Sequence, residues 1–237
     1  MIKKLLFVAA ILYTSAYSAT NEQIIQYFKA QIPIPAIHIE VTSRIKINSL
    51  KDMDYVSLDI NDGSRIQKVS VFTRDDLIFP DVISISAGGS IKQNLDKQKV
   101  ISQLAKVYKL EDQKNIINIG NDPKKETLVM FSDPECPFCR KELDNIEEKI
   151  KIYNLKLIFT PVHERSSLEK SALIYDQTKN IDNTEEKIKI LRKYFSGDVD
   201  EKVSEAEVAK IETLRQKYFH AGLQGVPFYV SEKNLLN

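Results

Sequence analysis

The chain contains two cysteines, Cys136 and Cys139, separated only by Pro137 and Phe138. Two thiols at this spacing can alternate between a dithiol and a disulfide. The apolar pattern predicts a strand that ends shortly before the pair and a helix over 137–152. The pair therefore lies where a strand passes into a helix, and this position favours thiol–disulfide exchange.

A helix start favours the thiolate form of Cys136. The first helical turn has unpaired amide groups, and it is the positive end of the helix dipole. Pro137 suits this turn because its missing N–H has no helical partner to lose. We expect Cys136 to be the attacking sulfur and Cys139, about one turn further in, to resolve a mixed disulfide. Glu135 opposes this effect, because a neighbouring carboxylate disfavours a thiolate.

Other interpretations of the pair are weaker. A structural disulfide stabilises more as its loop grows, and this loop has only two residues between the cysteines. A closed zinc site needs four ligands, and no two of the three histidines are spaced as a ligand pair. Two unrelated buried thiols would leave the strand-to-helix position unexplained. We expect no metal and no organic cofactor, because the redox-active Cys136–Cys139 pair is itself sufficient.

The start of the chain has the pattern of an export signal. Two lysines precede an apolar run over 5–13, and Ala16 and Ser18 are the small residues that a signal peptidase requires. We predict a signal peptide over 1–18 and a periplasmic protein. Lysine and arginine number 34 against 33 acidic residues, so the charge gives no reason to expect nucleic acid or an anionic membrane as partner.

Residues 19–90 predict a small α+β domain. Thr20 and Gln23 form a capping box at the start of a helix that should end before Pro33. Residues 37–47 alternate, with isoleucine and valine expected on one face and polar side chains, including Arg44, on the other. Shorter strands should follow at 56–60, 66–72, 77–79 and 82–85. Residues 91–112 should form a helix that links this domain to the next.

Residues 113–237 predict an α/β domain. Strands are expected at 116–119, 127–131, 155–159 and 228–230, and a strand–helix–strand order is typical of a parallel or mixed sheet. Residues 166–220 contain three amphipathic helical pieces, which we interpret as a helical insertion. The fold class is therefore α+β with two domains.

Two motifs resemble one known family. The stretch Phe131-Ser132-Asp133-Pro134-Glu135-Cys136-Pro137-Phe138-Cys139 resembles the active-site segment of the thioredoxin-like bacterial Dsb proteins, and is closest to the dimeric DsbC/DsbG type. Gly225-Val226-Pro227 is similar to the second motif of that family. The resemblance covers about residues 20–232.

The resemblance implies several further properties. Pro227 should follow a cis peptide bond and face the cysteines, and the backbone of Val226 should pair with the substrate chain as an added strand. Pro137 and Phe138 should also contact substrate. Residues 19–90 should be a dimerisation domain. The expected partners are unfolded or misoxidised secreted proteins, a second copy of the chain, and a membrane redox protein that resets the pair.

The sequence also departs from this family. DsbC has threonine where this chain has Val226, and valine is found there in the oxidase DsbA, so isomerase and oxidase both remain open. A dimeric holdase with incidental cysteines is an alternative of another class. The family has a further strand and a closing helix after Pro227, and we expect the domain at 113–237 to be short at this end.

Four polar residues are weaker candidates. His163 follows the third strand of the second domain, where it either tunes the thiols or is an exposed loop residue. His220 is expected to end a helix. His38 should be solvated on the polar face of its strand. Asp133 is expected to help set the turn before Cys136.

Overall fold

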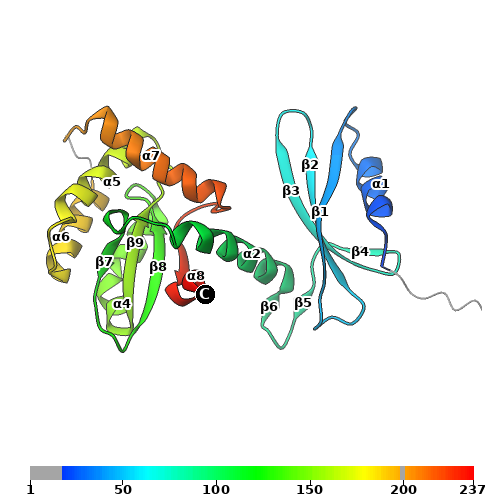
Figure 1. Cartoon of the computed structure of the whole chain (residues 1–237), viewed down its shortest axis with the longest axis horizontal. Coiled ribbons are helices and arrows are strands. Elements are labelled where there is room, and N and C mark those ends of the chain that lie inside the picture. The colour runs from blue at the N-terminus through cyan, green and yellow to red at the C-terminus, as the bar shows by residue number, and fades with distance from the viewer. Residues whose placement is uncertain (1–17, 198–200) are drawn as a thin grey trace, which may run out of the picture. The chain divides into compact units, whose positions relative to one another are not determined.

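The computed structural model describes residues 18–197 and 201–237. The predicted signal peptide, apart from Ser18, lies outside the described residues. Among those residues, no helix is long and apolar enough to cross a membrane. The chain divides into two compact units, one ending at Leu95 and the other formed by Asp96–Asn237 (Figure 1).

The first unit is a helix beside an antiparallel sheet. The sheet has the order β1-β2-β3-β4. Its elements are α1 (Asn21–Gln31), β1 (His38–Lys46), β2 (Asp54–Asn61), β3 (Ile66–Arg74) and β4 (Leu77–Phe79). The capping box between Thr20 and Gln23 is confirmed. Ile24 of α1 is fully buried in one cluster with Val56 and Leu58 of β2, so the amphipathic helix covers one face of the sheet.

A bulge in β1 makes part of the predicted alternation wrong. Residues 41 and 43 face consecutive residues of β2, so Thr42 is an extra residue. Beyond such a residue the side chains change faces. Arg44, predicted to point outward, is half-buried and bonds to Asp54 at 2.7 Å. Ile45, predicted to point inward, is exposed.

A short hairpin and a long helix follow the sheet. The hairpin pairs β5 (Ile83–Ser84) with β6 (Gly89–Ser90), and α2 spans Ile91–Tyr108. Gly88 has a φ of +71°, a conformation that favours glycine in this tight turn. The predicted helix from residue 91 is confirmed, although it ends at Tyr108 and not at 112.

The second unit contains a mixed sheet in the order β10-β8-β9-β7. The central strands β8 and β9 are parallel, and both edge strands are antiparallel to their neighbours. A short 3-10 turn, η1 (Gln113–Asn115), precedes the first of these strands. The strands are β7 (Ile117–Ile119), β8 (Glu126–Ser132), β9 (Tyr153–Phe159) and β10 (Phe228–Ser231). These positions confirm the α/β prediction for this half of the chain.

The helices of the second unit fall into two groups. Between β8 and β9 the predicted single helix is two helices, α3 (Pro137–Asp144) and α4 (Ile146–Ile152), separated by Asn145. Asn145 bonds through its side-chain amide to the carbonyl oxygen of Lys141 at 3.0 Å, a local bond that competes with helix continuation. The helical insertion is confirmed as α5 (Arg165–Thr178), α6 (Thr184–Phe195) and α7 (Glu205–His220).

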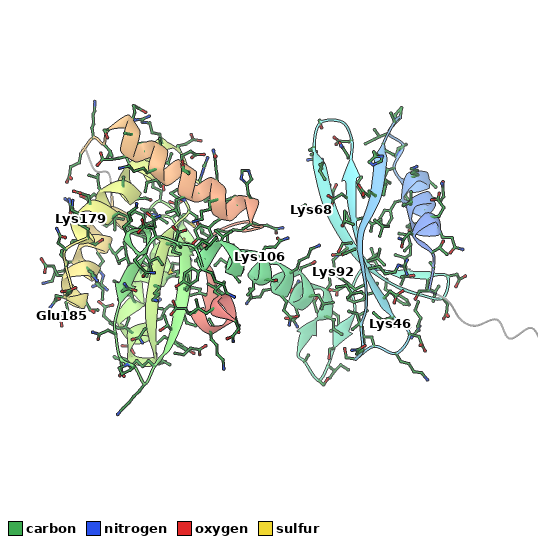
Figure 2. The ribbon with its side chains drawn as sticks, viewed as in Figure 1. Lys46, Lys68, Lys92, Lys106, Lys179 and Glu185 are labelled. Carbon is green, nitrogen blue, oxygen red and sulfur yellow. The ribbon has the colours of Figure 1, made fainter. Side chains whose placement is uncertain are left out.

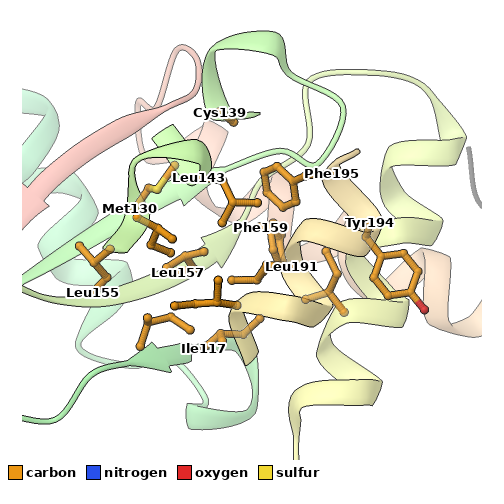
Figure 3. Close-up of a cluster of buried hydrophobic side chains, with 14 of the residues drawn as sticks. Ile117, Met130, Cys139, Leu143, Leu155, Leu157, Phe159, Leu191, Tyr194 and Phe195 are labelled. Atoms are coloured by element: carbon orange, nitrogen blue, oxygen red, sulfur yellow. The ribbon is translucent and has the colours of Figure 1, made fainter. Parts of the chain in front are cut away.

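Side chains on the two faces of this sheet enter different clusters. Along β8, Met130 belongs to one buried cluster, whereas Val129 and Phe131 belong to another, as strand alternation requires. The first cluster is shown in Figure 3, where Cys139 and Leu143 of α3 lie beside Phe195 of α6. Helix α3, which contacts the core of this cluster through both of these residues, is therefore held on one face of the sheet.

Charged side chains outside these clusters, such as Lys179 and Glu185, are exposed (Figure 2).

The end of the second unit differs from the prediction. We expected no helix after the strand at 228–230, but α8 (Glu232–Leu236) follows β10 directly. Leu235 of this helix is fully buried in the cluster that also contains Val129 and Tyr108. Tyr108 and Lys156 both bond to Glu232 through its Oε1 atom. One apolar side chain and one carboxylate thus attach α8 to the sheet and to α2.

Candidate active site

Cys136 lies at the N-terminus of α3. It is the N-cap residue, and Pro137 is the first residue of the helix. Its carbonyl oxygen accepts a hydrogen bond from the amide of Arg140 at 3.0 Å, the first bond of the helix. The thiol is therefore at the positive end of the dipole of α3, where a thiolate is favoured. The predicted passage from strand to helix is confirmed.

Both cysteines are free thiols, and both are buried. Cys136 is 4% exposed and Cys139 is 0% exposed, so the difference in cover that we expected is small. Burial raises the pKa of the Cys139 thiol to about 12, although the nearby Ser132 side chain and Asp133 backbone oppose the rise. At neutral pH, Cys139 is therefore held as a neutral thiol within the core.

The loop before β10 reaches the cysteine pair. The Val226–Pro227 peptide bond is cis, the geometry expected from the sequence. The Cys136 thiol donates a hydrogen bond to the carbonyl oxygen of Val226 at 3.7 Å. Strand β10 begins at Phe228, which is paired with Phe131 near the end of β8. The two segments, far apart in the sequence, are brought together because their strands are neighbours in the sheet.

The exposed side of the site is formed by the two residues between the cysteines. Pro137 is exposed, and Phe138 has 66% of its surface exposed, an unusual position for a large apolar side chain. The ammonium of Lys141 lies 5.9 Å from the centre of the Phe138 ring. An aromatic surface with a cation beside it is therefore presented next to the buried thiols.

Asp133 is the most heavily bonded side chain near the cysteines. Its Oδ1 accepts the amide of Glu135 at 2.7 Å and the hydroxyl of Ser167. Its Oδ2 accepts the amides of Val162 at 2.8 Å and His163 at 3.1 Å, and it bonds to the His163 ring at 2.7 Å. One buried carboxylate thus ties the turn before Cys136 to the segment after β9 and to α5. The prediction that Asp133 sets this turn is confirmed.

These bonds keep Asp133 ionised. Burial by itself raises the pKa of a carboxyl group, but the bonds from Ser167, His163 and the two backbone amides of Glu135 and Val162 hold the pKa of Asp133 below its ordinary value. The His163 side chain is 41% exposed while the carboxylate is fully covered. His163 is thus an exposed loop residue, as one of the two interpretations expected, and its ring is in addition bound to the carboxylate in the turn before Cys136.

Glu135 has partners that the sequence does not reveal. Its Oε1 lies 2.9 Å from the ammonium of Lys170, and its Oε2 accepts the hydroxyl of Ser166 at 2.9 Å. Both partners belong to α5. The carboxylate expected to oppose a thiolate at Cys136 is thus paired with a positive charge.

The other histidines do not take part in this arrangement. His38 is exposed on β1, and His220 is the last residue of α7, as expected. No group of three or more histidine, cysteine, aspartate or glutamate side chains among residues 18–197 and 201–237 is arranged to hold a metal ion.

Comparisons with solved structures find several similar chains. The chain resembles Helicobacter pylori DsbG with 20% identity and a TM-score of 0.52, over 89% of this chain and 99% of that one. A thiol-disulfide exchange protein, α-DsbA2 from Wolbachia pipientis, is 20% identical with a TM-score of 0.40, over 59% and 86% of the two chains. A periplasmic thioredoxin-like protein from Salmonella enterica serovar Typhimurium is 23% identical with a TM-score of 0.36, over 54% and 83%.

A comparison with family models gives the assignment of this domain. A search of curated proteins finds no match. The model of the thioredoxin-like domain matches residues 112–233, just over half of the 237 residues. The matched segment contains the mixed sheet, the Cys136–Cys139 pair and the loop with the cis Val226–Pro227 bond. The chain therefore belongs to the thioredoxin-like family.

Proposed function

We propose that the protein is a thiol–disulfide oxidoreductase that acts on the disulfides of other proteins. One observation carries the proposal: a buried dithiol lies at the start of α3 with the carbonyl oxygen of Val226 at 3.7 Å from the Cys136 sulfur. A helix N-terminus lowers the cost of a thiolate, and a second thiol within one turn can displace a bound substrate. The reaction needs no metal or organic cofactor.

The proposed reaction has two exchange steps. The Cys136 thiolate attacks one sulfur of a substrate disulfide, and the other substrate sulfur leaves as a thiolate that takes up a proton. Cys139 then loses its proton and attacks the sulfur of Cys136. The Cys136–Cys139 disulfide forms, and the second substrate sulfur leaves and is protonated. Two electrons have passed to the substrate; oxidation of a substrate is the same sequence in reverse.

We propose that substrates bind as extended chains across this surface. The exposed Pro137 and Phe138 supply apolar contact. Val226 and Pro227 are half-buried, and the Val226 carbonyl oxygen lies 3.7 Å from the Cys136 sulfur, which supports the proposal that the backbone of Val226 pairs with a substrate segment. The disulfide under attack would then lie next to the sulfur of Cys136.

The activity proposed is isomerisation of the DsbC/DsbG type, in which a second thiol of the same substrate, and not Cys139, displaces Cys136 from the mixed disulfide, so that no net electrons pass. The similarity in fold to DsbG extends over 89% of the chain and so includes residues of the first unit. Val226 supports the alternative, a DsbA-like oxidase. Refolding of a protein with scrambled disulfides separates the two, because an isomerase restores native pairing whereas an oxidase only forms new pairs. In both cases we propose export after Ser18 to the periplasm and a membrane redox partner that resets the pair.

Reduction of insulin disulfides tests the proposed function. With a thiol reductant present, the wild-type protein should accelerate insulin precipitation, and Cys136→Ser should reduce the rate to that of the reductant alone. A wild-type protein that gives no acceleration would refute the proposal. If both proteins then suppressed the aggregation of an unfolded client equally, the holdase would be the better assignment.

We further propose that the first unit forms a homodimer. Strand β1 is an edge of its sheet among the described residues, and Ile45 on it is 52% exposed. An edge strand with an exposed apolar side chain favours pairing with a second copy.

Sedimentation should give about twice the mass of one chain, and Ile45→Lys should weaken the association. Ile83→Lys, at a still more exposed position outside β1, is the control; a monomeric wild-type protein would exclude the dimer.

A further inference from the structure

The turn before Cys136 is bound at both of its acidic side chains by the start of α5. Asp133 accepts the hydroxyl of Ser167, and Glu135 accepts the hydroxyl of Ser166 and pairs with Lys170. The two acids lie on either side of Pro134. The segment that presents the attacking sulfur is therefore attached to the helical insertion as well as to the strand before it.

Lys170 is unusual for a lysine, because its side chain is only 8% exposed. Lysine is rarely buried unless it is paired, since an ammonium without a partner loses its hydration. The partner is the Glu135 carboxylate at 2.9 Å, which is itself 22% exposed. Charges in such a partly covered position are screened by salt much less than charges at the surface.

The position of this pair gives it a definite electrostatic effect. Glu135 is the residue immediately before Cys136, so its negative charge alone would disfavour a thiolate there. The positive charge of Lys170 opposes that effect. If one member of the pair is removed, the charge of the other acts on Cys136 without compensation. The two removals should therefore change thiolate formation in opposite directions.

We propose that Lys170 is a positioning residue that neutralises Glu135 and thereby sets how readily Cys136 forms its attacking thiolate. This proposal deepens the proposed function and rests on it. Two other charged features near this turn are the same in every variant below. They are the Asp133 carboxylate with its bound His163, and Arg140 in the first turn of α3.

A four-protein cycle in the full chain tests the proposal. The rate of Cys136 alkylation by iodoacetamide is measured against pH in a Cys139→Ser background, so that one thiol is observed. Lys170→Met should move the midpoint of the rate profile upward by about half to one pH unit, and Glu135→Gln should move it downward by a similar amount. The double variant should lie close to the wild-type midpoint. On the steep part of the profile these shifts are about three- to tenfold in rate.

Lys156→Met is the matched control. Lys156 is also a partly covered lysine of the same domain, but it bonds to Glu232 of α8 at 2.6 Å and not to the turn. The Lys156→Met variant should leave the midpoint of the alkylation profile unchanged. Unfolding would give Cys136 the ordinary pKa of an exposed thiol, about 8.5, and would by itself shift the midpoint, so only variants that keep the folded state are compared. Circular dichroism of each variant confirms the folded state.

The possible outcomes separate this inference from the proposed function. Equal shifts in the same direction for both single variants, or no shifts, would overturn the role of Lys170 even if the wild-type protein reduces insulin. The expected opposite shifts in a protein that does not reduce insulin would support the role of Lys170 on Cys136 reactivity and refute the oxidoreductase assignment.

Discussion

Replacing Cys139 with serine is expected to trap substrates on Cys136 as covalent mixed disulfides. Cys139 lies one turn into α3, so its attack on a mixed disulfide is intramolecular, and such geometry accelerates the step by many orders of magnitude over a free thiol. Without that thiol, release depends on an external thiol. We expect turnover with insulin to fall by at least about 100-fold. Non-reducing electrophoresis should show adducts that dithiothreitol removes.

The matching variant is Cys136→Ser, which should form no adducts although Cys139 is present. Burial holds the pKa of Cys139 at about 12, so in this variant iodoacetamide should react very slowly at pH 7 and faster as the pH rises toward that value. The fully covered position of Cys139 slows the reaction further. Adducts on Cys139 at a rate similar to those on Cys136 would contradict the assignment of the two sulfurs.

Replacing Asp133 with asparagine is expected to destabilise the second unit by about 2–4 kcal/mol. An amide offers one acceptor oxygen, whereas the carboxylate of Asp133 accepts bonds at both oxygens. The NH₂ group of asparagine would face either the donors on Glu135 and Ser167 or those on Val162 and His163. Asp133 and Ser167 are both fully buried, so water replaces the lost bonds poorly at the position of the carboxylate. Urea unfolding followed by circular dichroism measures the loss.

Asp122 provides a matched control. It begins the sequence Asp122-Pro123-Lys124 and accepts the Lys124 amide at 2.9 Å, just as Asp133 accepts the amide two residues on. Its side chain, however, is 44% exposed. Asp122→Asn should cost less than about 1 kcal/mol, because water can satisfy the groups that it leaves. If both variants lost the same free energy of unfolding, the bonds of Asp133 to Ser167, Val162 and His163 would contribute little beyond the bond within the turn itself.

The same network gives an acid dependence with a definite sign. The pKa of Asp133 in the folded protein is held below its ordinary value of 3.8. Its contribution to stability is therefore complete above that value and is lost as the pH falls through the lower pKa of the folded state. In Asp133→Asn this part of the acid dependence should be absent. The difference in free energy of unfolding between the wild-type protein and the variant should therefore shrink below about pH 4.

The sequence by itself predicted most of the elements and the position of the cysteine pair. The spacing of Cys136 and Cys139 within a strand-to-helix passage predicted the thiol pair at the start of α3. The capping box at Thr20 and the helical spacing after residue 91 predicted two helix starts. These features depend on neighbours within a few residues, and local interactions are what a sequence pattern records. Pro227 was predicted only through the family motif.

Other features were decided only by tertiary contacts. The bulge at Thr42 reverses the faces of Arg44 and Ile45, because the register is set by pairing with β2. The bonds from Val162 and Ser167 to Asp133 join residues about 30 positions apart, and nothing in the turn itself indicates them. The only local features that could indicate this network are an Asp-Pro turn and two serines near the start of a helix.

Lys170 shows the same limit most clearly. Its burial and its pairing with Glu135 depend on how α5 packs against the turn, 35 residues earlier in the chain. From the sequence alone, Glu135 could only be counted as a charge that opposes a thiolate at Cys136. Electrostatic effects depend on distance and burial, and both are properties of the folded chain. Whether the charge of Glu135 is compensated is therefore decided by the packing of α5.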